Sequence, residues 1–304
     1  MSETSLSKAT GPVGLIGIGL MGTSIARRLL AAGFTVVGTD PRAEARAQLA
    51  TLGGEPVADI AVIAARCPTV VLAVYDTAQV EDVVAGPLGL LSLTAADRRT
   101  LRVLNTATCD PDRVAALATR IAPQGLALVE LPVSGTSDQV ARGDGVGLVA
   151  GDKSQAEAAA RIIEAICPRT YFMGAAGNGA KTKLAINHVL GLNRAALAEG
   201  LVFAERLGLP LAAFLDAAKG SAAYSQIMDV KGAKMIARDF SPHGKVTQSL
   251  KDFKLILAEA RARGQPLPLA SVYAELMAAC VSAGDGEADN CCIIDEVRRR
   301  GAPH

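Results

Sequence analysis

The chain has 304 residues, half of them hydrophobic, and its 31 Lys and Arg nearly balance its 30 Asp and Glu, for a formal net charge of +1. This composition excludes a disordered chain, because so apolar a sequence can bury a core, and the length indicates two domains or one large one. Nucleic acid is not an expected partner, since phosphate binding needs clustered Lys and Arg and only 3% of the residues are aromatic.

Cysteines and histidines are dispersed along the chain. The six cysteines form no CxxC pair: Cys67, Cys109, Cys167, Cys280, Cys291 and Cys292. We expect reduced thiols, because a chain of this length can bury its core without disulfides. The three histidines are too far apart for a recognisable ligand set, so we expect no metal: His188, His243 and His304.

The polar residues 1–11 contain no apolar stretch before a cleavage site, and no segment reaches about 18 uninterrupted apolar residues. We therefore expect neither a signal peptide nor a transmembrane helix. Together with the reduced thiols, this predicts a cytoplasmic protein with no membrane partner.

Short apolar runs alternate with helix-like segments in the first half of the chain. Strands are predicted at residues 13–16, 35–39, 70–74, 101–104 and 127–130, and helices at 21–31 and from residue 43. A repeated strand–helix pattern is typical of a parallel sheet covered on both faces. Two more strand-like runs, at 145–149 and 170–173, flank a predicted helix at 153–165.

The second half shows only helical periodicity. Helices are predicted at residues 181–207, 211–219, 229–238, 248–263 and 267–283. We place the domain boundary in the glycine-rich stretch Gly174–Gly179. The predicted fold class is α/β, a Rossmann-type doubly wound sheet over residues 1–176, followed by an all-α C-terminal domain over residues 177–304.

A glycine motif, Gly17-Ile18-Gly19-Leu20-Met21-Gly22, links the first strand to the first helix. In this context the first glycine allows a tight turn, the second lets a pyrophosphate approach the backbone, and the third lets helix and strand pack closely. The helix N-terminus then offers free N–H groups to the phosphates. The motif predicts a dinucleotide site formed by all six residues. A glycine-rich turn without a ligand is the alternative.

Asp40 ends the second strand, 18 residues after Gly22. A carboxylate at this spacing accepts hydrogen bonds from the ribose hydroxyls and repels a 2′-phosphate, which favours NAD over NADP. Arg42 is close enough to tolerate the 2′-phosphate, so NADP stays the second choice. A helix cap ahead of Pro41 is the alternative role for Asp40.

Lys183 and Asn187 are four residues apart, on one face of the predicted helix that opens the second domain. A partly desolvated lysine there suits proton transfer, and the asparagine could orient a substrate hydroxyl. From spacing alone, a solvated surface lysine is the alternative, and Lys181 is a rival candidate.

Ordered motifs along nearly the whole chain resemble those of the β-hydroxyacid dehydrogenases, the group of 3-hydroxyisobutyrate dehydrogenase, tartronate semialdehyde reductase and L-threonate dehydrogenase. The glycine motif carries the family's Met before its last glycine. Four other segments are similar to the family's Asp-x-Ser-Thr-x-x-Pro, Ala-Pro-Val-Ser-Gly-Gly, Gly-x-Gly-x-x-x-Lys-x-x-x-Asn and Lys-Asp-Leu motifs: residues 105–111, 131–136, 177–187 and 251–253.

The resemblance implies an NAD(P)-dependent oxidoreductase that transfers hydride reversibly at the β-carbon of a small 3-hydroxy acid, such as 3-hydroxyisobutyrate, glycerate or threonate, or the matching semialdehyde. It makes Lys183 the general acid–base and Asn187 the residue that orients the reacting oxygen. It assigns the substrate carboxylate to Ser134, Gly135 and Thr136.

The resemblance also extends the cofactor set, in which NAD is expected and NADP is the alternative. Thr108 is expected beside the nicotinamide ribose, and Lys251 near cofactor and substrate. Val74 and Tyr75, at the end of the 70–74 strand, complete the expected cofactor-binding residues.

The chain departs from the family's usual pattern at three positions that bear on the substrate. Thr136 replaces the second glycine of the carboxylate motif, Ile186 replaces the first Asn of a common Asn-Asn pair, and Gln226 stands where Trp is frequent. The segments at 239–243 and 266–271 look closest to the L-threonate dehydrogenase branch, which suggests a small polyhydroxy acid.

Two other functions fit the same scaffold. Imine reductases share it but generally lack the lysine, and a non-catalytic NAD-sensing module leaves Lys183 and Ser134 unexplained. The apolar helix at 181–207 and the Ala-rich second half suggest subunit packing, so a homodimer or homotetramer is expected.

Overall fold

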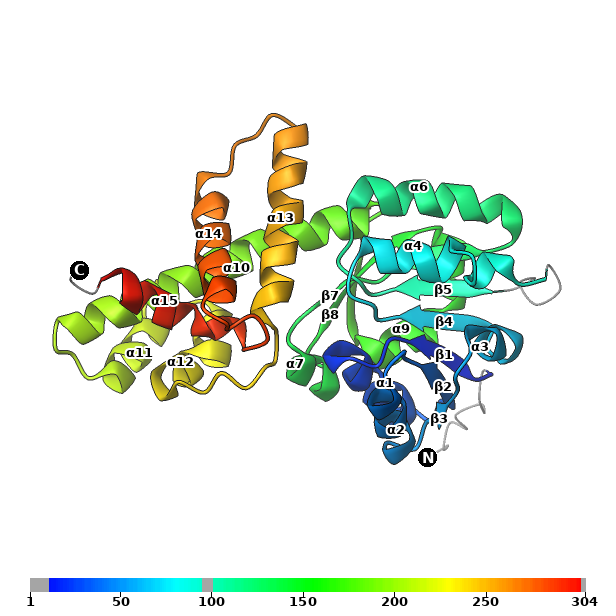
Figure 1. Cartoon of the computed structure of the whole chain (residues 1–304), viewed down its shortest axis with the longest axis horizontal. Coiled ribbons are helices and arrows are strands. Elements are labelled where there is room, and N and C mark those ends of the chain that lie inside the picture. The colour runs from blue at the N-terminus through cyan, green and yellow to red at the C-terminus, as the bar shows by residue number, and fades with distance from the viewer. Residues whose placement is uncertain (1–10, 95–100, 302–304) are drawn as a thin grey trace, which may run out of the picture. The chain divides into compact units, whose positions relative to one another are not determined.

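The computed structural model describes residues 11–94 and 101–301, in two compact units, residues 1–183 and 184–304 (Figure 1). The limit between the units falls inside one helix, α10 (Asn178–Arg206). The domain boundary expected between residues 176 and 177 stays a prediction. The expectation that the polar N-terminus is not a signal peptide concerns residues 1–11, and residues 1–10 lie outside the described part.

The first unit is built on a sheet of nine strands in the order β3-β2-β1-β4-β5-β6-β8-β7, with β9 paired to β8. The strands are β1 (Val13–Ile16), β2 (Val36–Thr39), β3 (Glu55–Pro56), β4 (Thr69–Leu72), β5 (Arg102–Asn105), β6 (Ala127–Glu130), β7 (Val133–Ser134), β8 (Val146–Gly151) and β9 (Arg169–Phe172). The first six are parallel, and five of them were predicted. The two-residue strand β3 was not predicted, because its residues are exposed and form no apolar run.

The strand order reverses at β1, which pairs with β2 on one side and β4 on the other. In open sheets of this kind, ligands bind outside the carboxyl ends of the strands at such a reversal. The Rossmann-type sheet is therefore confirmed, and the reversal places the glycine motif after β1 beside the end of β4.

One part of the sheet is not parallel. β8 runs antiparallel to both β6 and β7, while β9 is parallel to β8. The reason is that β7 follows β6 after only two residues, and the short helix α7 (Ser137–Arg142) then turns the chain back along β8. No long crossover helix separates these strands, so they need not run in the same direction.

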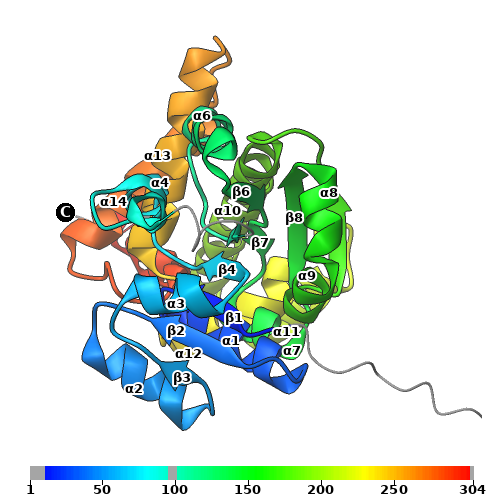
Figure 2. The same cartoon turned by 90° about the vertical axis from the view of Figure 1, so that its right-hand side faces the viewer.

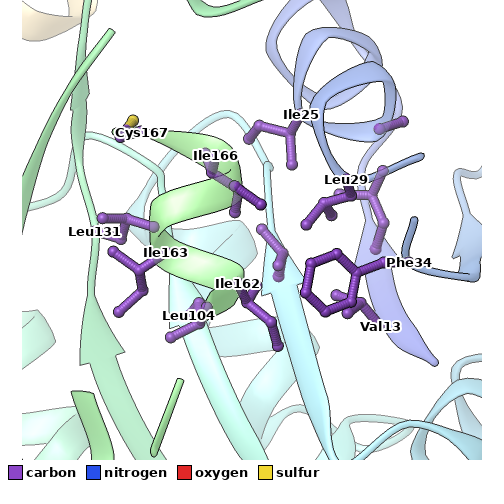
Figure 3. Packing of buried hydrophobic residues seen from close by; sticks show 14 of the residues in the cluster. Val13, Ile25, Leu29, Phe34, Leu104, Leu131, Ile162, Ile163, Ile166 and Cys167 are labelled. Carbon is purple, nitrogen blue, oxygen red and sulfur yellow. The ribbon is translucent and has the colours of Figure 1, made fainter. Parts of the chain in front are cut away.

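Helices cover both faces of the sheet, because successive strand residues point to opposite sides. On one face Ile25 and Leu29 of α1 (Leu20–Ala31) pack with Ile162 and Ile166 of α9 (Ala160–Ile166) over the strands (Figure 3). The opposite face is covered mainly by α3 (Ile60–Arg66), α4 (Thr77–Ala85) and α6 (Pro111–Ile121).

Two further helices of this unit are α2 (Ala43–Thr51), which contacts β3, and α8 (Lys153–Ala158), which lies beside β8 (Figure 2). The single helix predicted at 153–165 is divided into α8 and α9. Ala159 leaves the helical region, with φ −100° and ψ 4°, and separates the two.

The second unit is helical, as predicted. Its elements are the greater part of α10, then α11 (Leu211–Lys219), a π-helical turn (Met228–Gly232), α12 (Ala233–Ala237), α13 (Val246–Ala262), α14 (Pro268–Ser282) and α15 (Ile293–Arg300). Helices α13 and α14 lie side by side (Figure 1). Phe253 and Tyr273 stack between them with ring centroids 4.1 Å apart, and Gly191 leaves α10 room to approach Phe253.

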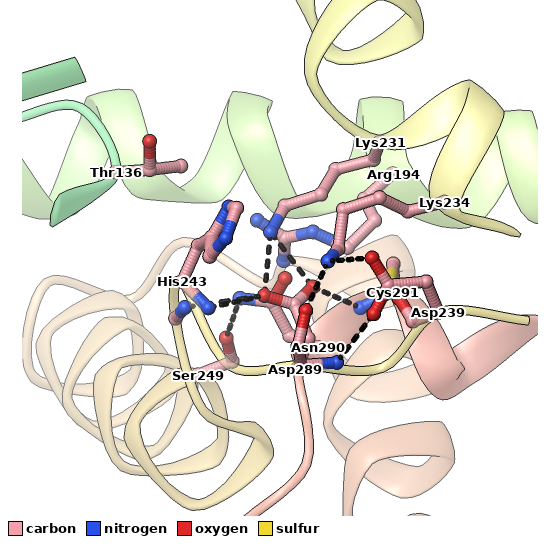
Figure 4. A network of polar contacts seen from close by, with 12 residues as sticks. Thr136, Arg194, Lys231, Lys234, Asp239, His243, Ser249, Asp289, Asn290 and Cys291 are labelled. Carbon is pink, nitrogen blue, oxygen red and sulfur yellow. Dashed lines mark hydrogen bonds and ion pairs between the residues drawn. The ribbon is translucent and has the colours of Figure 1, made fainter. Parts of the chain in front are cut away.

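A buried ion pair joins three segments of the helical unit (Figure 4). Lys231 Nζ donates to both carboxylate oxygens of Asp289 at 2.7 Å, and the two side chains are 1% and 0% exposed. Asp289 also accepts the backbone N–H groups of His243, Gly244 and Cys291. Burial opposes ionisation of Asp289, but Lys231 and these N–H groups outweigh it and hold the pKa of the carboxyl below its usual value.

All six cysteines are free and buried, as expected for reduced thiols. Within the described ranges, no helix combines the length and the apolar character needed to cross a membrane. Nor do three or more His, Cys, Asp or Glu side chains gather into a metal-ligating group anywhere in residues 11–94 and 101–301.

The Lys231–Asp289 pair yields a stability prediction. We expect Asp289→Ala to lower the free energy of unfolding by about 3–5 kcal/mol, because it leaves a buried ammonium without its partner. The matched control is Asp239→Ala, which breaks the more exposed Lys234–Asp239 pair and should cost less than about 1 kcal/mol. Urea unfolding followed by circular dichroism measures both, and equal effects would contradict the interpretation.

Candidate cofactor and substrate site

The glycine motif has the local geometry that a pyrophosphate requires. Gly17 has φ +94°, and a Cβ there would lie 2.6 Å from the Ala73 carbonyl oxygen, while a Cβ on Gly22 would lie 2.0 Å from the Gly17 oxygen. A Cβ on Gly19 would meet nothing within 4 Å, and Gly19 caps α1 without any side-chain hydrogen bond. The first and third glycines therefore allow close packing, and the second leaves the helix N-terminus open to a phosphate.

Asp40 lies beside this loop, as its spacing predicts. Its Oδ2 accepts the N–H of Ile18 at 2.8 Å and Nη2 of Arg42 at 3.0 Å, and its Oδ1 accepts the N–H and Nε of Arg42. Burial opposes ionisation, but the hydrogen bonds from Arg42 and Ile18 outweigh it and lower the pKa of Asp40. The carboxylate is ionised and 5% exposed, whereas the Arg42 side chain is 63% exposed.

A ribose can reach Asp40 only if the exposed Arg42 moves, because Arg42 bonds to both carboxylate oxygens. The alternative of a helix cap ahead of Pro41 does not hold, since Arg42 rather than Asp40 is the N-cap of α2. A nearby second cation, Arg46, is held by the carbonyl oxygens of Asp40 and Pro41.

The ends of β4 and β5 carry the next expected cofactor residues. Val74 and Tyr75 follow β4, and the backbone N–H of Tyr75 donates to Gln79 Oε1 at 2.8 Å. After β5, Asn105 accepts the N–H of Ala107 and donates to the Cys109 sulfur, which shapes the loop holding the buried Thr108. These residues therefore lie beyond the carboxyl ends of the neighbouring strands β4 and β5.

The segment expected to hold a substrate carboxylate has one donor fewer than predicted. Gly135 has φ +147°, a conformation that other residues rarely adopt. Thr136 caps α7 in a capping box with Gln139: the Thr136 hydroxyl oxygen accepts the Gln139 N–H, and the Thr136 N–H donates to Gln139 Oε1. Its hydroxyl hydrogen can still donate to a substrate, but its backbone N–H is already engaged.

Lys183 is buried, with 7% of its surface exposed, while Lys181 is exposed. The alternative of a solvated surface lysine is therefore wrong for Lys183, and it fits Lys181 instead. Burial raises the pKa of the Cys167 thiol to about 12, and the charges of Arg28 and Lys183 act against that rise. The Lys183 side chain therefore lies within electrostatic range of Cys167, on the side of α10 that faces the first unit's sheet.

Asn187 and Lys251 meet in the second unit through a residue that sequence reasoning did not assign. Asp252 Oδ2 accepts a hydrogen bond from Asn187 Nδ2 at 2.8 Å, and Lys251 Nζ lies 3.0 Å from Asp252 Oδ1. One amide N–H of Asn187 is thereby used, and its orientation is set. Asp252 could have been found from the sequence, because it follows Lys251 in the same motif.

Glu130, at the end of β6, is a second residue that was not assigned from the sequence.

The structure thus places the predicted residues in two groups. The glycine motif, Asp40, Thr108, the 134–136 segment and Lys183 belong to the first unit, whereas Asn187 and Lys251 belong to the second. His188, next to Asn187, packs near the Phe253 ring at a centroid distance of 6.2 Å.

Comparison with known proteins agrees with these groups. Residues 12–174 match the family described as the NAD binding domain of 6-phosphogluconate dehydrogenase, and residues 177–297 match that described as NAD-binding of NADP-dependent 3-hydroxyisobutyrate dehydrogenase. The L-threonate dehydrogenase of Cupriavidus necator is 32% identical over 283 residues, which cover 93% of this chain and 94% of that protein. The chain belongs to the β-hydroxyacid dehydrogenase family.

Other relatives of this β-hydroxyacid dehydrogenase agree. The 2-hydroxy-3-oxopropionate reductase of Escherichia coli is 29% identical over 286 residues, which cover 93% of this chain and 95% of that protein. The crystal structure of a 3-hydroxyisobutyrate dehydrogenase from Salmonella typhimurium has a TM-score of 0.84 and 26% identity, and covers 94% of this chain and 99% of that chain. The protein is therefore an NAD(P)-dependent oxidoreductase.

The open face at Gly19 yields a binding prediction. We expect Gly19→Ala to leave the melting temperature nearly unchanged, because its Cβ has no neighbour, but to weaken NADH binding by about tenfold, equivalent to roughly 1.4 kcal/mol of lost contact. Gly22→Ala should instead lower the melting temperature, since its Cβ collides with Gly17. Fluorescence titration with NADH and thermal unfolding measure both. Unimpaired binding by Gly19→Ala would place the pyrophosphate elsewhere.

Proposed function

We propose that this β-hydroxyacid dehydrogenase transfers hydride reversibly at the β-carbon of a small 3-hydroxy acid, with Lys183 as general acid–base and NAD as the preferred cofactor. The observation that carries the proposal is the burial of Lys183, at the motif position where the family resemblance expects the catalytic lysine, beside the exposed Lys181.

Lys183 moves one proton in each direction. Its neutral amine accepts the proton of the substrate hydroxyl during oxidation, and its ammonium returns a proton to the carbonyl oxygen during reduction. Bound NAD supplies the hydride acceptor. A correctly placed acid–base of this kind contributes about 10²–10⁴-fold to the rate.

The substrate carboxylate is assigned to the 134–136 segment. Ser134 and Thr136 supply hydroxyl donors, and Gly135 between them supplies a backbone N–H. Asn187, oriented by Asp252, presents its amide oxygen and remaining N–H to the reacting oxygen. Polar hydroxyl donors and few aromatic residues suit a small hydroxylated acid.

The similarity to L-threonate dehydrogenase and to 2-hydroxy-3-oxopropionate reductase supports a hydroxy acid of three to five carbons, with threonate favoured. The six free, buried cysteines support a cytoplasmic enzyme. Exposed apolar side chains in the helical unit, among them Phe203, Leu207 and Leu209, support a homodimer or homotetramer.

A panel assay with Lys183→Ala tests the chemistry. We expect the wild-type enzyme to reduce NAD with at least one acid among 3-hydroxyisobutyrate, glycerate and L-threonate. Lys183→Ala should lower kcat on that acid by about 10²–10⁴-fold, because proton transfer is lost, with NADH affinity nearly normal. Lys181→Ala is the matched control and should keep its activity. Normal turnover by Lys183→Ala would contradict the assignment of Lys183 as the general acid–base.

Cofactor preference depends on the Asp40–Arg42 pair. Asp40→Ser removes the charge that repels a 2′-phosphate and releases Arg42, so we expect the ratio of kcat/KM with NADP to that with NAD to rise by about tenfold or more, about 1.4 kcal/mol. Arg42→Ala should change that ratio in the opposite direction. Initial rates with both cofactors decide the matter, and a ratio unchanged by either substitution contradicts the assigned roles.

A further inference from the structure

We propose that Glu130 is a positioning residue for Lys183: its carboxylate anchors the first turn of α10 against the sheet and thereby sets where the Lys183 side chain lies. The proposal rests on the proposed function, since it takes Lys183 as the proton-transfer residue. Glu130 itself touches neither substrate nor cofactor in this account.

Glu130 ends β6 and is 0% exposed. Its Oε1 accepts the N–H of Gly177 at 2.5 Å, its Oε2 accepts the N–H of Ala180 at 2.8 Å, and the carboxylate is also hydrogen-bonded by the N–H of Gly179. These are N–H groups at the start of α10, which lack partners within the helix. A strand-end side chain 47 residues away in the sequence therefore caps the helix that carries Lys183.

The chemistry favours a carboxylate at this place. Three N–H donors converge on two oxygens, and only an ionised carboxyl offers acceptor sites alone. A negative charge also interacts favourably with the positive end of the helix. Burial raises the pKa of Glu130, while the three N–H groups and the charge of Lys181 act against that rise.

The motif glycines allow the carboxylate to reach the helix start. Gly177 has φ +91°, and a Cβ on it would lie 2.9 Å from the Pro111 carbonyl oxygen. A Cβ on Gly179 would lie 3.0 Å from Glu130 Cβ and 3.1 Å from the Leu148 carbonyl oxygen. Gly179 therefore lies against Glu130 of β6 and Leu148 of β8, and Gly177 against Pro111 at the start of α6, where a larger side chain would collide.

Lys183 follows this anchored turn without a break. It is four residues after Gly179, so it lies on the same helix face, about 6 Å further along the axis. Helix α10 is continuous here, and a shift of its first turn moves Lys183 with it. A displacement of about 1 Å at a reacting group can cost 10²-fold in rate.

The test compares Glu130→Gln with wild type and with Asp152→Ala. Asp152 also caps a helix of the first unit, through the N–H groups of Ser154 and Gln155, but that helix is α8 and carries no proposed catalytic residue. The substrate is the hydroxy acid on which the wild-type enzyme is most active, unlabelled and deuterated at the reacting carbon.

We expect Glu130→Gln to lower kcat by about 10–100-fold, because its amide nitrogen faces N–H donors and the first turn shifts. NADH affinity and substrate KM should change less than about twofold, the deuterium isotope effect on kcat should rise, and the 177–180 amides should exchange hydrogen faster. Asp152→Ala should match wild type in kcat. If Glu130 had a purely structural role, its substitution would lower stability and the yield of active enzyme but would not change the isotope effect.

Each outcome decides. If Glu130→Gln exchanges faster at 177–180 but keeps kcat within about twofold, the inference is overturned. If Glu130→Gln does not fold, Glu130→Asp is tested instead, because it keeps the charge but is one carbon shorter. A lower kcat with a raised isotope effect supports the inference, and unchanged values overturn it. Normal turnover by Lys183→Ala overturns the proposed function instead, whatever Glu130→Gln does.

Discussion

Two helices of this protein begin where glycines let backbone lie against backbone, and the candidate sites of the first unit depend on that contact. At α1, Gly17 and Gly22 close the turn, and the bare Gly19 leaves the helix end open to an anion. At α10, Gly179 brings the helix start onto the sheet, and Gly177 lets it pass close to the Pro111 carbonyl. At the start of α10, the Glu130 carboxylate already accepts hydrogen bonds from the free N–H groups. The same physical feature is thus open for a ligand in one place and filled by Glu130 in the other.

Three buried aspartates have local partners for their charge. Asp40 is held by Arg42, Asp289 by Lys231, and Asp252 by Lys251 and the Asn187 amide. Because isolated charges are costly to bury, each pair restricts the geometry of the segments it joins. Asp289 binds the backbone just before α13, at His243 and Gly244. Asp252 lies further along in α13, next to Lys251. The net charge of +1 therefore says little about function, because the charges that matter are a few buried groups in fixed positions.

Much of the fold could be predicted from the sequence, because it follows from short-range patterns. Apolar runs located five of the six parallel strands, and the spacing from the glycine motif placed Asp40 beside the loop between β1 and α1. The antiparallel direction of β8 and the break at Ala159 depend on long-range pairing and on one backbone angle, so periodicity did not reveal them. Periodicity also could not separate buried Lys183 from exposed Lys181, nor show that Gln139 occupies the Thr136 N–H. Glu130 carried no local signal, since its partners are 47 to 50 residues away.

Lys183 transfers the proton that accompanies hydride transfer in the proposed reaction, and rescue of Lys183→Ala by small primary amines can show whether it does. The truncated side chain leaves space for an external amine, whose basicity can be varied while its size stays similar. We expect amines to restore turnover in proportion to their concentration, and the rescue rate to rise with amine pKa, as general base catalysis requires. Rescue that is absent for every amine, or independent of amine basicity, would contradict it.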